Sequence, residues 1–81
     1  MSTFLVERYL PSATAADVEA AVARVVDAHS SRARHLFTVL VAGEETGLSC
    51  FAALDRDTVA AVNQAAGFPF DRIIEVTTYM A

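Results

Sequence analysis

The chain has 81 residues, a net charge of −4 and one cysteine, and 54% of its residues are hydrophobic. A chain of this length fills one hydrophobic core, so we expect a single domain over residues 1–81. The lone Cys50 excludes an internal disulfide and a multi-cysteine metal cage, and a negative charge without any lysine argues against a nucleic-acid surface.

Hydrophobicity also bears on location and assembly. No apolar run approaches the roughly 18–20 residues of a membrane-spanning helix, and the first residues lack the pattern of a signal peptide, so we expect a cytoplasmic protein. The hydrophobic fraction exceeds the roughly 45–50% of an average soluble domain. A partner chain that covers the excess is the simplest explanation.

The first half of the chain predicts a strand and a helix. Residues 3–10 have the composition of a strand, which Pro11 ends. Thr14 and Asp17 have the spacing of a capping box, so a helix should begin near Ala15. Its residues at helical spacing form one stripe: Val18, Val22, Val25 and His29.

The second half predicts a hairpin, a helix and a closing strand. Residues 35–41 and 48–53 read as strands joined by a glycine-flanked hairpin loop. Asp55 or Asp57 should cap a second helix, which Gly67 and Pro69 end. Residues 73–80 are dense in β-branched and aromatic side chains and predict the last strand.

This order of elements predicts a ferredoxin-like βαββαβ α+β fold, with two helices on one face of a four-stranded antiparallel sheet. The other sheet face is then uncovered, and a monomer rarely exposes a large apolar surface. We therefore predict a homodimer through the open sheet face, forming a dimeric α+β barrel. The apolar residues expected on this face are Leu5, Tyr9, Leu36, Leu40, Phe51, Ile73 and Tyr79.

Polar residues are expected on the same face, namely Glu7, Thr38, Ser49, Glu75 and Thr77. The first and last strands are neighbours in this topology, so Glu7 and Glu75 are expected to approach one another. Two carboxylates in a half-buried barrel would titrate abnormally or share a proton, an arginine or a metal. The simpler interpretation pairs Glu7 with an arginine, or leaves Glu75 hydrated at the rim.

Several short motifs span nearly the whole chain: Phe4-Leu5-Val6-Glu7-Arg8, Leu10-Pro11, Ser49-Cys50-Phe51-Ala52-Ala53, Ala66-Gly67-Phe68-Pro69, Asp71-Arg72-Ile73 and Glu75-Val76. Together they resemble the small bacterial family of nickel-binding, nickel-responsive proteins. The Val-Glu-Arg strand and the Ala-Gly-Phe-Pro turn are the most specific of these. The lysine-free, alanine-rich composition suits an actinobacterial type of source.

The resemblance implies a ferredoxin-like subunit, a dimeric α+β barrel, and Ni²⁺ held at the dimer surface for nickel sequestration or detoxification. One departure concerns the metal site. Family members carry a histidine-serine pair within the second strand, where this chain has Thr38-Val39-Leu40, so that ligand cannot be transferred.

Nickel favours imidazole nitrogen, carboxylate oxygen and water as ligands. In the predicted topology His29 and His35 flank a short loop at one end of the domain, and Asp55 and Asp57 should lie at that end too. We therefore expect a metal site from His29, His35, Asp55 and Asp57. The alternative for His29 is a partly buried last turn of the helix, where its charged form suits the helix dipole. Cys50, among apolar neighbours, suits core packing better than a reactive thiol.

The primary hypothesis is thus a homodimer that binds nickel weakly near its surface and is non-catalytic. The runner-up is a dimeric α+β-barrel enzyme or small-molecule binder with a cavity lined by Glu7, Thr38, Glu75 and Tyr79, with Cys50 nearby. A structural or regulatory dimer without a ligand is the third hypothesis. No nucleophile, base and orienting group are visibly coupled, which disfavours catalysis.

Overall fold

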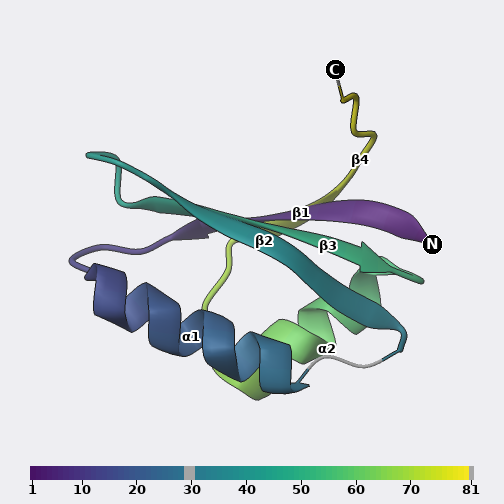
Figure 1. Ribbon diagram of the computed structural model, residues 1–81, viewed down its shortest axis with the longest axis horizontal. Helices are drawn as coiled ribbons and strands as arrows, with labels where there is room; N and C mark the ends of the chain where they lie inside the picture. Colours follow the sequence, from purple (N-terminus) through teal and green to yellow (C-terminus); the bar gives the residue numbers. More distant parts are fainter. Residues whose placement is uncertain (29–30, 81) are drawn as a thin grey trace.

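The computed structural model describes residues 1–28 and 31–80. Its elements follow the order β1 (Ser2–Tyr9), α1 (Ala15–Ala28), β2 (Ala33–Val41), β3 (Thr46–Ala53), α2 (Arg56–Ala66) and β4 (Arg72–Val76). The antiparallel sheet has the strand order β2-β3-β1-β4. Both helices lie on one face of it (Figure 1). The predicted ferredoxin-like fold is confirmed.

Both helices begin at the predicted caps. At α1, Thr14 N donates to Asp17 Oδ2 at 2.9 Å and Asp17 N donates to Thr14 Oγ1 at 3.1 Å, which is a reciprocal capping box. At α2 the cap is Asp55 and not Asp57, because Asp55 Oδ1 accepts from Thr58 N at 2.8 Å. Gly67 ends α2 with φ 65°, a left-handed conformation that glycine adopts without strain.

The core lies between the sheet and the two helices. Its largest fully buried apolar side chains are Val6 from β1, Phe51 from β3, Val25 from α1 and Val59 from α2. The predicted stripe on α1 packs there, with Val25 buried and Val18 and Val22 partly buried against the core. His29, the last member of that stripe, lies outside the described residues. No described helix is long and apolar enough to cross a membrane.

The predicted division of residues between the two sheet faces was wrong in part. Phe51 and Ile73 are buried in the core beneath the helices, with 0% and 7% exposure, and do not lie on the open face. The strand register explains both positions, because it pairs Phe51 on β3 with core residue Phe4 and Ile73 on β4 with core residue Val6.

A β-bulge changes the faces of β2. The register shifts between His35 and Phe37, so the alternation of side chains changes phase at Leu36. Beyond the bulge, Phe37 and Val39 take the open face, and Thr38 pairs with Ser49 on the helix-covered face. Thr38 and Leu40 were therefore assigned to the wrong face, since a single inserted residue inverts the pattern. Ser49 on β3 was also assigned to the wrong face, because it pairs in register with core residue Val6.

The last strand is shorter than predicted. It ends at Val76, which pairs with Thr3, and β1 itself begins one residue earlier at Ser2, so little of β1 remains for further pairing. Residues 77–80 carry strand-like side chains but form no strand. They leave the sheet on the side away from the helices (Figure 1).

Candidate functional site

The open sheet face is predominantly apolar. Phe37 and Val39 on edge strand β2 are 50% and 45% exposed. The register adds further apolar side chains to this face: Leu5, Val41, Leu48, Cys50, Ile74 and Val76. At the opposite edge strand, Arg72 Nη2 lies 2.8 Å from Glu7 Oε2, so the only ion pair among the described residues belongs to this face.

The two carboxylates expected to meet do not. Glu7 pairs with Arg72, as the simpler interpretation held. Glu75 pairs in register with the core residue Phe4, which places it on the other face of the sheet, where it is exposed. Because adjacent strands share faces in register, Glu7 and Glu75 point away from one another and form no carboxylate pair within the subunit.

The other residues of the expected cavity are also dispersed. Thr38 lies on the helix-covered face, bonded to Ser49 and His35, whereas Tyr79 lies beyond β4 and is 91% exposed. Cys50 is 2% exposed at the middle of β3, and burial raises the pKa of its thiol. The subunit therefore does not gather these side chains around one cavity, and Cys50 has the environment of a packing residue.

Three of the residues expected to bind metal lie toward the end of the fold where β2 begins: His35, Asp55 and Asp57. Leu54 N donates to Arg32 O at 2.9 Å, which ties the segment before α2 to the segment before β2. Asp55 follows directly and is exposed, and its pKa is lowered by hydrogen bonds from the side chain and backbone of Thr58 and by the charge of Arg32. Asp57 is exposed in the first turn of α2.

His35 lies nearby on the helix-covered face and is half-buried. Its Nε2 is 2.8 Å from Thr38 Oγ1, and its ring meets the Phe51 ring edge-on with centroids 5.5 Å apart. These contacts fix the plane of the imidazole. His29 lies outside the described residues.

The donor set decides what kind of metal site is chemically possible. Among the described residues, no three side chains of His, Cys, Asp or Glu gather as a metal cage would require. His35, Asp55 and Asp57 offer imidazole nitrogen and carboxylate oxygen, which are ligand types that nickel accepts together with water. Their ligand types suit nickel, but the described residues do not gather into a closed site.

A buried arginine that the sequence analysis did not single out dominates the polar interior. Arg8 is 1% exposed between the sheet and the helices. Its Nη1 donates to the carbonyls of Phe68 and Pro69 at 3.3 and 3.2 Å, and its Nη2 donates to Ser49 Oγ at 2.7 Å and Asn63 Oδ1 at 2.8 Å. All four acceptors are uncharged. Burial lowers the pKa of Arg8 to about 10, so it stays charged at neutral pH.

Hydroxyl groups connect this arginine to His35. Ser49 Oγ lies 2.7 Å from Thr38 Oγ1, which in turn contacts His35 Nε2. Arg8 Nη2 donates to Ser49 Oγ, so Ser49 is the acceptor in that bond. The hydroxyls of Ser49 and Thr38 each have one proton, so each can donate only one hydrogen bond. The tautomer of His35 is therefore coupled to the orientation of the half-buried Thr38 hydroxyl and the buried Ser49 hydroxyl.

Two sequence signals pointed to this network. Arg8 alternates with Phe4, Val6 and Leu10 on one face of β1, so a core-facing β1 had to bury it. Asn63 is buried with Val59, Val62 and Ala66 along the apolar stripe of α2, and its amide also donates to Val59 O at 2.8 Å. Buried polar groups need hydrogen-bond partners, so one polar residue in each of two apolar stripes indicates that the two stripes pack against each other.

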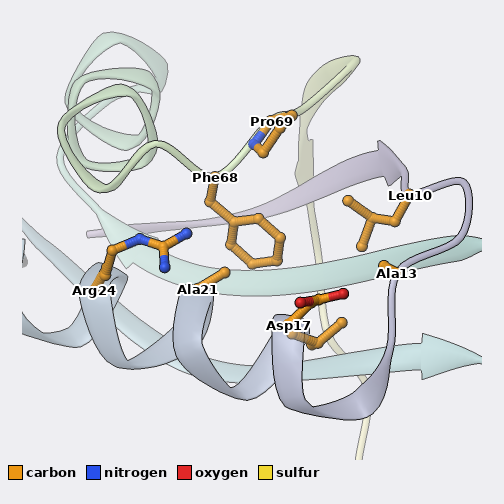
Figure 2. Close-up of a pocket in the computed structure, with 8 residues that line it drawn as sticks. Leu10, Ala13, Asp17, Ala21, Arg24, Phe68 and Pro69 are labelled. Atoms are coloured by element: carbon orange, nitrogen blue, oxygen red, sulfur yellow. The ribbon is translucent and has the colours of Figure 1, made fainter.

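A separate pocket opens between α1 and the turn after α2 (Figure 2). Its volume is about 160 Å³, and its lining is mostly apolar: Leu10, Ala13, Val18, Ala21, Phe68 and Pro69, with Asp17 and Arg24 at its sides. Each of the two charged residues already holds the fold, because Asp17 Oδ2 accepts from Thr14 N and Arg24 Nε donates to Ala66 O at 2.7 Å. The pocket therefore lacks a charged group dedicated to a ligand.

Comparison with known proteins shows which family model and which solved structure the chain resembles. A family model described as nickel responsive protein SCO4226-like matches residues 4–76, which confirms the resemblance found in the sequence. The crystal structure of SCO4226 from Streptomyces coelicolor A3(2) is similar with a TM-score of 0.76, covering 98% of this chain and 100% of that chain. At 17% identity this likeness shows a shared fold. No curated protein matches.

Proposed function

Because the chain belongs to the SCO4226-like family of nickel responsive proteins, we propose that it binds nickel, as a homodimer, and sequesters or detoxifies it without catalysis. The observation that carries this proposal is the family match over residues 4–76. The donor chemistry at the start of β2 supports it, since nitrogen and oxygen donors lie toward one end of the fold.

The ligands proposed are His29 and His35 for nitrogen and Asp55 and Asp57 for oxygen, with water completing the coordination. His35 is the best oriented of these, because Thr38 Oγ1 and the Phe51 ring fix its plane. If Nδ1 binds the ion, Nε2 keeps its proton and donates to Thr38 Oγ1. A ligand histidine that donates its second nitrogen in this way is held in the correct tautomer.

The dimer is proposed to form through the open sheet face. Phe37 and Val39 are about half exposed there, beside the apolar side chains of three other strands. Burial of this face by a second copy would remove apolar surface from water and close the sheets into an α+β barrel. The Glu7–Arg72 ion pair of this face lies toward the β4 edge and can remain hydrated.

Isothermal titration calorimetry of tag-free protein with NiCl₂ tests the metal proposal. We expect saturable binding in the wild type and at least tenfold weaker binding in His29→Ala or His35→Ala, since each removes a nitrogen donor. Glu44→Gln is the matched control, because it removes a carboxylate from the hairpin at the other end of β2.

Circular dichroism must show that His35→Ala remains folded, because its ring packs on Phe51. No heat of binding in the wild type overturns the metal proposal. Full affinity in both histidine variants overturns the proposed ligands.

A further inference from the structure

We infer that residues 77–80 of each copy cross the dimer interface and lie against edge strand β2 of the partner, where Tyr79 and Met80 cover Phe37 and Val39. This inference rests on the proposed homodimer and assigns an interaction to a segment that makes no hydrogen bond or strand pairing with residues 1–28 or 31–76 of its own subunit. It follows from the exposure of that segment, its direction and its length.

Exposure is the first argument. Tyr79 and Met80 are both 91% exposed, more than any other large hydrophobic residue described. The segment follows β4 but pairs with no strand, and its side chains are exposed. Neither core packing nor sheet hydrogen bonding within the described subunit therefore explains its two large apolar side chains. Two adjacent large apolar side chains in water favour a partner surface.

Direction is the second argument. The segment leaves the sheet on the face opposite to the helices, which is the open face (Figure 1). Val76, the residue before it, shares that face with Thr3. The segment therefore extends toward the space that a second copy would occupy.

Length is the third argument. Packed sheets lie about 10 Å apart, and four extended residues span roughly 13 Å at about 3.3 Å each. Residues 77–80 are thus long enough to cross from one sheet to the other. Tyr79 and Met80, at the far end, would arrive at the level of the partner's sheet.

The arrangement of the strands selects the site on the partner. β4 and β2 are the two edges of the sheet, and β2 carries the most exposed apolar pair of the open face, Phe37 and Val39. In a face-to-face dimer whose twofold axis runs along the strands, β4 of one copy lies over β2 of the other. In the register Val76 is level with Thr3, Ala52 and Arg34, so the segment that follows β4 starts at the level of Arg34 of the second copy and turns back along β2 to reach Phe37 and Val39.

Sedimentation equilibrium on substituted full-length chains tests the contribution of the segment. We expect the dimer dissociation constant of Tyr79→Ser/Met80→Ser to rise at least about tenfold, because four large apolar side chains per dimer are lost. The matched control Thr77→Ser/Thr78→Ser changes the same segment without removing its large side chains and should dimerise as the wild type does. An unchanged dissociation constant in Tyr79→Ser/Met80→Ser overturns the inference.

Fluorescence provides an independent readout. The chain has two tyrosines and no tryptophan, so Tyr9→Phe leaves Tyr79 as the only tyrosine. We expect iodide to quench Tyr79 less in the Tyr9→Phe dimer than in Tyr9→Phe/Val39→Asp, whose interface is charged. Equal quenching with a dimer present overturns the crossing segment and leaves the homodimer standing, whereas a wild-type monomer at all concentrations overturns both.

Discussion

The guanidinium of Arg8 lies 3.6 Å from the centre of the Phe68 ring, although the two residues are 60 positions apart in the chain. Arg8 also bonds the carbonyls of Phe68 and Pro69. The Val-Glu-Arg strand and the Ala-Gly-Phe-Pro turn, which carry the family resemblance most specifically, are therefore two halves of one contact. These motifs hold the turn after α2 against β1 through hydrogen bonds and a cation–π contact, so they contribute to packing.

The first prediction concerns this contact. Arg8→Met should lower the free energy of unfolding by about 2–3 kcal/mol, because it leaves buried acceptors on Ser49 and Asn63 without a donor. The triple variant Arg8→Met/Ser49→Ala/Asn63→Leu should recover at least half of that loss, since removing the two side-chain acceptors avoids their desolvation cost and leaves only the Phe68 and Pro69 carbonyls without the arginine. Urea unfolding at one fixed protein concentration measures both.

Arg56→Met, at an exposed arginine of α2, is the control for loss of one positive charge. A triple variant less stable than Arg8→Met alone would show that the network contributes more than the satisfaction of its own polar groups.

The second prediction concerns pH. Hydrogen bonds from Thr58 hold the pKa of Asp55 below its usual value, so the folded carboxylate loses its proton more readily than the unfolded one. Its contribution to stability is therefore present above about pH 4 and is lost as the pH falls further. Asp55→Asn keeps a capping oxygen that does not titrate, so the melting temperature of this variant should depend less on pH below that point.

Thermal melts in EDTA across the acid range, with Asp57→Asn as the control for loss of a neighbouring carboxylate, measure the difference. If the melting temperature of Asp55→Asn depended on pH as strongly as that of the wild type, the assignment of this pH dependence to Asp55 would be contradicted.

The third prediction concerns the open face. Val39→Asp should raise the dimer dissociation constant by at least about tenfold, because dimerisation would bury an unpaired carboxylate. The subunit should stay folded, since Val39 lies outside the core. Val26→Asp introduces the same charge at an equally exposed valine of α1 and should leave assembly unchanged. Loss of assembly in Val26→Asp alone would place the interface on the helices.

The fourth prediction concerns Cys50. Its thiol is buried and its pKa is raised by burial, so a disulfide reagent such as DTNB should modify the folded protein at least about a hundredfold more slowly than the protein in denaturant. A time course of absorbance at neutral pH gives the two rates. Rapid labelling of the folded protein would show an accessible thiolate and reopen a chemical role for Cys50.

The fold was predictable because its signals are local. The Thr14–Asp17 capping box begins α1 and Gly67 ends α2 through contacts within a few residues, and β-branched and aromatic composition indicated the four strands. The division of the sheet faces was not fully predictable, because one bulge at Leu36 inverts the face of every later residue in β2. That register is set by pairing with β3, which the sequence of β2 alone does not contain.

The candidate site was less predictable than the fold. Arg8 and Asn63 stand in apolar stripes, which indicates that they are buried but does not identify the partners of either side chain. Glu7 and Glu75 were brought together by strand adjacency, yet adjacency leaves the register open by one residue, and one residue decides the face. Metal ligands are harder still, since they depend on side chains from separate loops that meet only in three dimensions.

A native mass spectrum of the tag-free protein, recorded with NiCl₂ and again with MgCl₂, tests the central claim most directly. We predict a species at twice the subunit mass of 8.7 kDa that carries nickel and retains far less magnesium. A spectrum that contains only the 8.7 kDa chain, or a dimer that takes up no more nickel than magnesium, would contradict the account.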